Sequence, residues 1–342
     1  MSRLDVVICG SAVLDMFARA ESRLVKIETR NSETDLLCFR SGSKIQIDEL
    51  TLSVGGGAIN AGTAIHRLGI RAGALIKLGE DSNGQYIADY LGRLGLPFFK
   101  TPRSHINTGF SVIFESLDGD RTILAYKGAN DDLNIHEINV DEILDTEWMY
   151  FASMTGESLE TQIALVAQAK KKGIKILYAP SSYLLRDGAE KVKPLITAAD
   201  ILIMNMEEAH MLLGRNFSQG TISDQDTNEI LKGLHKICPR IVVVTNGDKP
   251  ANAYDGKTRY TCQAYPVKAV ELAGAGDAFA AALLAGIIKE NSIEAGMEMG
   301  IANSSSVITK YGTTVGLLSY EDCWQRIRQI RSEGYTIEKK AI

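Results

Sequence analysis

The sequence predicts an α/β protein whose mostly parallel central sheet is covered by helices on both faces. Short β-branched runs alternate with longer amphipathic segments from Leu4 onward, which is typical of βαβ units joined by right-handed crossovers. The runs are short and almost wholly apolar, as in strands that are buried on both faces. They are Val6-Val7-Ile8-Cys9, Ile174 to Tyr178, Ile201 to Ile203 and Ile241 to Val244.

Length and composition exclude several classes of protein. With 342 residues, 45% hydrophobic and 23% charged, the chain is expected to fold around one main core. A net charge of −5 without a long basic block argues against a nucleic-acid partner. The longest apolar stretch, Ala278 to Ile288, is too short to span a bilayer. We therefore expect a cytoplasmic protein with no membrane partner.

Two stretches interrupt the alternation. Residues 17–54 are irregular and polar, and end in a partly alternating run from Lys44 to Leu50. Residues 107–127 contain two strand-like runs around Asp118-Gly119-Asp120, which is a hairpin signal. We expect these insertions to form a small antiparallel sheet beside a main domain made of residues 1–16, 55–106 and 128–342.

The last third of the chain has a helical pattern. Apolar residues recur at helical spacing with few breakers in three segments, Ala275 to Ile288, Ser292 to Tyr311 and Tyr320 to Ile330. These segments are expected to cover one end of the sheet.

The most informative motif is Gly274-Ala275-Gly276-Asp277, at the start of the first of these helical segments. Small residues leave the backbone N–H groups of a helix start uncovered, so that an anion such as phosphate can bind there. Asp277 would lie beside that anion and could accept a proton from an attacking hydroxyl. Taken alone, the alternative that Asp277 only caps the helix is equally good.

A second glycine-rich motif, Gly55-Gly56-Gly57-Ala58-Ile59-Asn60, also precedes a helical segment. Glycines allow a ligand to approach the backbone closely, and the Asn60 amide has donors and an acceptor that suit polyol hydroxyls. The alternative is a tight turn with Asn60 as a local cap.

Two nucleotide-binding signatures fail. A dinucleotide fingerprint requires GxGxxG, but Asn60 and Phe279 occupy the place of the third glycine in the two candidate motifs. The segment from Ala251 to Thr258 resembles a loosened Walker A pattern, but Asp255-Gly256 indicates a hairpin turn rather than a helix start. An oxidoreductase and a P-loop enzyme are both disfavoured.

Other candidate residues follow the predicted strands, where open α/β sheets bind their ligands. Asp15 could accept hydrogen bonds from two sugar hydroxyls, and Glu208, three residues after Asn205, could hold a hydrated Mg²⁺ near phosphates. Thr245 and Gly247 belong to a turn whose backbone could face a nucleotide. For each of these, a plain turn or an exposed helix start is the alternative.

In their order along the chain, Asp15, the Asn60 motif, Asn205-x-x-Glu208, Thr245-x-Gly247 and the Gly274–Asp277 motif resemble the ribokinase-like, or PfkB-type, carbohydrate kinase family. The resemblance covers essentially the whole chain. It implies a three-layer sandwich with a small β lid, formed here by residues 17–54 and 107–127. It also implies ATP and Mg²⁺, and transfer of a phosphoryl group to a hydroxyl, which we expect to be a primary one.

The resemblance also implies roles for individual positions. Asp277 matches the general base, and its loop matches the anion hole (Gly274, Ala275 and Gly276). The positions that match sugar-binding residues are Asp15, Gly56, Gly57 and Asn60. Asn205 and Glu208 match a motif for Mg²⁺, reached through water, and phosphate, while Thr245, Gly247 and Asn303 match the nucleotide pocket.

The sequence departs from the family before Gly274. Glu271-Leu272-Ala273 stand where Asp-Thr-Thr or Asn-Thr is usual, so a monovalent cation such as K⁺ stays an open expectation. The acceptor is expected to be a monosaccharide or a sugar derivative; a nucleoside kinase and a non-catalytic sugar- or nucleotide-binding protein are the alternatives. We also expect a homodimer through the lid. Lys44 and Lys127 at its edges could contact an acidic or phosphorylated substrate, but a solvated side chain is the preferred interpretation of each.

Overall fold

A nine-stranded sheet forms the centre of the protein in a computed structural model that describes residues 3–20, 23–28, 33–115, 121–186, 188–217, 222–238 and 240–342. The strand order is β15-β14-β13-β12-β11-β10-β9-β1-β6. Strands β6 to β12 in this order are parallel, and β13, β14 and β15 extend the sheet antiparallel. The bounds are β1 (Leu4–Cys9), β6 (Ala72–Leu75), β9 (Thr146–Ala152), β10 (Lys175–Ala179), β11 (Ile201–Asn205), β12 (Ile241–Asn246), β13 (Lys249–Tyr254), β14 (Thr258–Cys262) and β15 (Glu338–Ala341).

Helices cover both faces of this sheet, so the main body has three layers. One face carries α1 (Gly57–Arg67), α2 (Ser82–Leu94), α9 (Ala275–Glu290), α10 (Ile293–Val307) and α11 (Tyr320–Ser332). The other carries α3 (Val140–Ile143), α4 (Gly156–Lys171), α5 (Ser182–Arg186), α6 (Lys193–Ala198), α7 (Met206–Leu212) and α8 (Asp224–Ile237). The α/β architecture with a mostly parallel sheet is therefore confirmed.

The apolar runs of the sequence are buried because helices lie on both sides of them. Val6, Val7 and Ile8 in β1 have no exposed surface, and Val6 and Ile8 face one helical layer while Val7 faces the other. This explains why these strands are apolar at every position rather than at alternate ones. The C-terminal helical segments cover one face of the sheet, and not one end of it as the sequence suggested.

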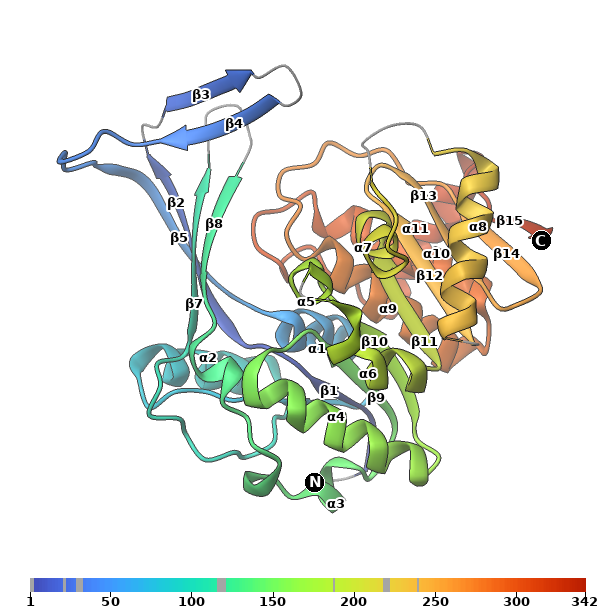
Figure 1. The fold of residues 1–342 in the computed structure, drawn as a ribbon, viewed down its shortest axis with the longest axis horizontal. Coiled ribbons are helices and arrows are strands. Elements are labelled where there is room, and N and C mark those ends of the chain that lie inside the picture. The colour runs from blue at the N-terminus through green and yellow to red at the C-terminus, as the bar shows by residue number, and fades with distance from the viewer. Residues whose placement is uncertain are drawn as a thin grey trace.

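A second, smaller sheet projects from the body, with a two-stranded hairpin at its far end (Figure 1). Its order is β5-β2-β7-β8, and the separate hairpin pairs β3 with β4. The expectation of an antiparallel sheet is wrong for one pair, because β2 and β7 run parallel. The bounds are β2 (Val13–Ala20), β3 (Arg23–Glu28), β4 (Glu33–Cys38), β5 (Ile47–Gly55), β7 (Gly109–Glu115) and β8 (Arg121–Tyr126). The Asp118-Gly119-Asp120 turn lies outside the described residues.

The two faces of this small sheet differ in polarity. Asp15 pairs in register with Ser53 and Ser111, which places these polar residues on one face. The opposite face is apolar and largely uncovered, with Leu50 56% and Leu124 57% exposed. An exposed apolar sheet face of this kind is typical of an interaction surface.

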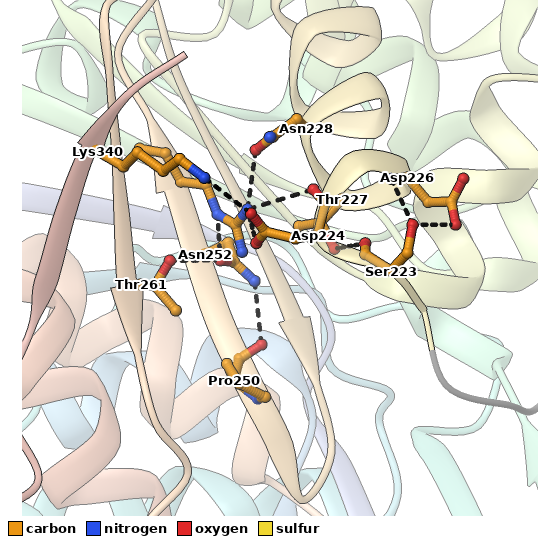
Figure 2. A network of polar contacts seen from close by, with 10 residues as sticks. Ser223, Asp224, Asp226, Thr227, Asn228, Pro250, Asn252, Thr261 and Lys340 are labelled. Atoms are coloured by element: carbon orange, nitrogen blue, oxygen red, sulfur yellow. Dashed lines mark hydrogen bonds and ion pairs between the residues drawn. The ribbon is translucent and has the colours of Figure 1, made fainter.

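Polar side chains tie the start of α8 to the antiparallel edge of the main sheet, as Figure 2 shows. The buried Arg259 donates through Nε to Asn252 Oδ1 at 2.9 Å and through Nη1 to Asn228 Oδ1 at 2.8 Å. It also forms an ion pair with Asp224. Lys340 of the last strand donates to the other oxygen of Asp224 at 3.1 Å. The network therefore joins β13, β14 and α8 to β15, which lies far from them in the sequence.

Among the described residues, no helix combines the length and the apolar composition needed to cross a bilayer.

Candidate active site

A cavity of about 360 Å³ lies at the carboxyl ends of the parallel strands. Residues from five successive strand ends line it, namely Ser11 after β1, Ser153 after β9, Ser181 after β10, Asn205 at the end of β11 and Thr245 in β12. Gly274, Gly276 and Asp277 at the start of α9 close another side. This is the edge at which open α/β sheets bind their ligands.

The start of α9 is suited to bind an anion. Gly274 is the N-cap residue in a left-handed conformation (φ 80°), and a side chain there would collide with Thr313. The N–H of Ala275 donates to the carbonyl of Leu272 at 3.3 Å. The N–H groups of Gly276 and Asp277 have no partner among the described residues. Two uncovered donors at the positive end of a 16-residue helix suit an anion, and we call this position the candidate anion site.

Asp277 lies beside these donors and faces the cavity. Its Oδ2 accepts a hydrogen bond from Asn60 Nδ2 at 2.8 Å. Burial raises the pKa of Asp277 to about 6, and the hydrogen bond from Asn60 opposes this shift. The side chain keeps a partly exposed surface where it borders the cavity, while protein atoms surround the rest of it. A carboxylate with this pKa is ionised at neutral pH and is suited to accept a proton.

The second glycine-rich motif positions Asn60. Gly56 precedes α1 with a φ of 99°, and a Cβ there would lie 2.5 Å from the carbonyl oxygen of Ser11. The N–H of Ala58 donates to that same oxygen at 3.1 Å. This tight turn brings the first turn of α1 against the strand end at Ser11. Asn60 Oδ1 is buried and has no partner among the described residues, so it is an acceptor available to a ligand.

Asp15 lies on the small sheet and is 7% exposed. Burial raises its pKa to about 6, and a hydrogen bond from Ser111 lowers it in part. A side chain at Gly55 would meet Asp15 Oδ2 at 2.3 Å. Asp15 is not among the residues that line the cavity, so in this conformation the structure does not bring it to Asp277.

Asn205 and Glu208 form a capping box at the start of α7. Asn205 Oδ1 accepts from the N–H of Glu208, and Glu208 Oε2 accepts from the N–H of Asn205, both at 2.8 Å. Burial raises the pKa of Glu208. Both residues line the cavity. A helix start is therefore present, as the alternative had it, but Glu208 is buried, with a relative exposure of 8%, rather than exposed, and its carboxylate also accepts from the Ser182 N–H.

Of the three residues expected to line the nucleotide pocket, one lines the cavity and two do not. Thr245 lines the cavity. Gly247 lies in the turn between β12 and β13 with a φ of 57° and open space around it. Asn303 is fully buried, donates to the Ala278 carbonyl at 3.4 Å and accepts from the Leu318 N–H at 2.9 Å. It does not line the cavity, because its amide joins α10 to α9 and to the segment before α11.

Two tyrosines of the cavity, Tyr150 and Tyr183, were not predicted from the sequence, and Lys127 was noted only as a charge at the edge of the lid. Tyr150 in β9 is fully buried and its hydroxyl has no partner among the described residues. Burial, and then the charge of Asp277, raise the pKa of Tyr150. Lys127 and Tyr183 line the same cavity, with Lys127 Nζ 4.0 Å from the Tyr183 ring centre. The expectation of a solvated Lys127 is therefore wrong, since its side chain is half-buried. No motif marks these residues, because only the fold brings them together.

Glu271 occupies a buried position in the loop before Gly274, and its Oε1 accepts from the Ala273 N–H at 2.7 Å. This contact holds the loop that leads into the candidate anion site. The K⁺ expectation stays a prediction.

Comparison with known proteins agrees with this geometry. Residues 22–319 match the family described as pfkB family carbohydrate kinase. The chain is 25% identical over 282 residues to the 5-dehydro-2-deoxygluconokinase of Halalkalibacterium halodurans, covering 79% of this chain and 83% of that protein. It is 26% identical over 253 residues to the probable fructokinase-5 of Arabidopsis thaliana, covering 70% and 75%.

A solved structure shows the same fold. The ribokinase of Arabidopsis thaliana, complexed with ribose and ATP, matches with a TM-score of 0.76 and 20% identity, covering 95% of this chain and 99% of that one. The predicted ribokinase-like fold, with a large mostly parallel sheet and a separate small sheet, is confirmed. The chain belongs to the pfkB family of carbohydrate kinases, and it is a phosphotransferase with an alcohol group as acceptor.

Proposed function

We propose that the protein transfers the γ-phosphoryl group of ATP to a hydroxyl, preferably primary, of a monosaccharide or sugar derivative. One observation carries the proposal: Asp277, with a pKa raised to about 6 by burial, stands beside the two unpaired N–H groups of Gly276 and Asp277. Phosphoryl transfer requires this combination of a proton acceptor and fixed donors for the transferred group.

In the proposed reaction, Asp277 accepts the proton of the acceptor hydroxyl. The acceptor oxygen bonds to the γ-phosphorus, the bond between that phosphorus and the β–γ bridging oxygen breaks, and ADP leaves with the electron pair. The N–H groups of Gly276 and Asp277 donate to oxygens of the transferred phosphoryl group. The Asn60 amide fixes the orientation of the Asp277 carboxylate through its 2.8 Å hydrogen bond.

The acceptor is proposed to bind between α1 and the small sheet. Asn60 Oδ1, which is buried without a partner among the described residues, would accept from one hydroxyl. Asp15 would accept from others once the small sheet closes over the site as a lid, together with the backbone of Gly56 and Gly57. We propose residues 17–54 and 107–127 as this lid, because most of the small sheet that projects from the body lies in them (Figure 1). The sheet itself extends slightly further, because β2 begins at Val13 and β5 ends at Gly55.

The nucleotide is proposed to bind on the side of β11 and β12, where Asn205, Glu208 and Thr245 line the cavity and Gly247 lies in the adjoining turn. Glu208 already accepts from the N–H of Asn205, and no three His, Cys, Asp or Glu side chains of the described residues group around a metal position. The residues fit a Mg²⁺ ion that keeps its waters and is bound mainly by phosphates. When bound, Mg²⁺ would neutralise phosphate charge there. Asn303 is not assigned a contact with the nucleotide, because its amide is used to join α10 to α9 and to Leu318.

The apolar outer face of the lid supports a homodimer. Leu50 and Leu124 are more than half exposed, and they lie on the face opposite Asp15. A second copy of the same face would bury them.

A substrate panel tests the proposed function. The relatives named 5-dehydro-2-deoxygluconokinase and fructokinase favour a sugar or sugar derivative over a nucleoside. ADP release is measured with ATP and Mg²⁺ against sugars, sugar acids and nucleosides, with Asp277→Asn as the matched inactive variant. We expect acceptor-dependent ADP release in the wild type alone. Preference for a nucleoside, or release that Asp277→Asn retains, would contradict the proposal.

A further inference from the structure

Lys127 is held in place at the base of the small sheet. It directly follows β8, and its carbonyl oxygen accepts from the N–H and from Nδ2 of Asn130, both at 3.1 Å. The same Asn130 amide donates to the carbonyl of Ala12 at 3.0 Å and accepts from the Ala12 N–H at 2.8 Å. These buried bonds fix the backbone of Lys127 beside the strand end that carries Ser11.

The side chain of Lys127 forms part of the cavity wall. Its Nζ lies 4.0 Å from the centre of the Tyr183 ring, within the range of a cation–π contact. The Tyr183 hydroxyl donates to the Ser153 carbonyl at 3.3 Å. All three residues line the cavity that contains Asp277. The aromatic ring therefore positions the ammonium group without consuming its hydrogen-bond donors.

Among the described residues, no carboxylate forms an ion pair with this ammonium group. No other lysine or arginine is among the residues that line the cavity. A lysine ammonium has three donors. A half-buried cation that faces a cavity and has no acidic partner is matched by an anionic ligand.

The sheet order indicates which ligand this is. Ser153 follows β9, which pairs with β1 next to Ser11 and the Asn60 turn, whereas Asn205 and Thr245 follow β11 and β12. Asn130 ties the backbone of Lys127 to Ala12, next to Ser11, whose hydroxyl accepts from the Gly57 N–H, so the backbone of Lys127 stands on the side of the proposed acceptor. Tyr183, over whose ring the ammonium lies, is next to Ser182, whose N–H donates to Glu208, so the ammonium points toward the middle of the cavity. We infer that the acceptor carries an anionic group, a carboxylate or a phosphate ester, which pairs with Lys127. This inference rests on the proposed function for which side binds the acceptor.

Binding of matched ligand pairs tests the inference without requiring turnover. Aldonates of five and six carbons are each compared with the alditol of the same length, and sugar 6-phosphates with the parent sugar, by thermal shift and by titration calorimetry. The variants are Lys127→Met, which removes the charge, and Lys127→Arg, which keeps it. Lys44→Met is the matched control, because Lys44 is exposed and does not line the cavity.

We expect at least one anionic ligand to bind the wild type more tightly than its neutral partner. Lys127→Met should lower the affinity for that ligand about 10- to 100-fold, as for a lost charge-assisted hydrogen bond. The neutral partner and ATP should stay within about twofold, Lys127→Arg should retain most of the affinity, and Lys44→Met should have no effect. The aldonate and phosphate arms identify which anion is bound.

Three results would overturn the inference. The first is that the wild type binds the anionic and the neutral ligand of every pair with equal affinity. The second is that Lys127→Met weakens the binding of both ligands of a pair equally. The third is that Lys127→Met weakens the binding of ATP alone. Failure of the proposed function is distinguishable, since it would leave Lys127-dependent anion binding intact but without ADP release. Conversely, turnover of neutral sugars that is indifferent to Lys127 would refute the inference and leave the proposed function standing.

Discussion

Replacing Asp277 by Asn is expected to remove activity and to stabilise the protein at the same time. Asn has almost the same shape and can still accept from Asn60 Nδ2, the partner at 2.8 Å, but it cannot accept the proton of the acceptor. Loss of one preorganised catalytic group typically lowers kcat by about 10² to 10³ or more. ATP binding should stay within about tenfold, or about 1.4 kcal/mol.

The stability gain follows from the pKa of Asp277. Burial raises this pKa from 3.8 to about 6, so the folded state holds the proton more tightly than the unfolded state. The ionised carboxylate therefore lowers stability as pH rises from about 4, and the loss is nearly complete above about 7. The loss in the free energy of unfolding is at most about 3 kcal/mol at pH 8 and about half of this at pH 5.

This effect is measurable as a shift in Tm. For 342 residues the unfolding entropy is about 0.7 kcal/mol/K, so about 3 kcal/mol corresponds to a Tm rise of about 4 °C at pH 8 in Asp277→Asn. Calorimetry at pH 5 should show about half that rise. In the wild type, kcat/KM should fall as pH drops through about 6, since Asp277 becomes protonated. An Asn variant with more than a tenth of the wild-type kcat, or with a Tm at pH 8 no higher than the wild type, would refute the reasoning.

Three further predictions concern residues outside the candidate anion site. Tyr150→Phe and Tyr178→Phe each remove a buried hydroxyl without a partner among the described residues. Chemical denaturation should therefore show that each variant is about 1 kcal/mol more stable than the wild type. A loss of stability would contradict this and would reveal a hidden partner of the hydroxyl. Leu124→Asp places a charge on the exposed apolar face of the lid and should convert a dimer into a monomer in sedimentation; a monomeric wild type would contradict the proposed interface. Arg259→Met breaks the network of Figure 2 and should lower stability by about 2 to 4 kcal/mol, with a Tm unchanged from the wild type as the contradicting result.

The sequence predicted the main sheet well because its strands are buried on both faces. Such strands are apolar at every position, as in the run from Ile241 to Val244, and the pattern needs no knowledge of partners. The small sheet was harder to predict. Its strands are covered on one face or on neither, and β2 pairs in parallel with β7, almost one hundred residues later. No local pattern specifies such a pairing, so the sequence indicated strands there but gave the wrong orientation for one pair.

The site likewise contains residues that a local motif indicates and residues that no local motif indicates. Asp277 and Asn60 could be proposed because each follows a glycine motif whose backbone geometry is local, such as the left-handed N-cap at Gly274. Lys127 was noted only as a charge at the edge of the predicted lid, and Tyr183 has no signal in the sequence. They are 56 positions apart by their numbers in the sequence. They meet because Asn130 ties Lys127 to Ala12 after β1, β1 pairs with β9 and β9 with β10, and α5 follows β10.

This division bears on how acceptor choice can differ within one family. The groups that we propose to move the proton and stabilise the phosphoryl group lie on α1 and α9, which pack on the same face of the main sheet, so their geometry is set by the core. Lys127 instead follows the last strand of the small sheet and reaches the cavity through its contact with Tyr183. A substitution at Lys127 can therefore alter which acceptor binds while leaving the distance between Asn60 and Asp277 unchanged. If acceptor preference and kcat instead changed together in Lys127→Met, the two halves of the site would be coupled, and the lid would have to position Asp277 as well as the acceptor.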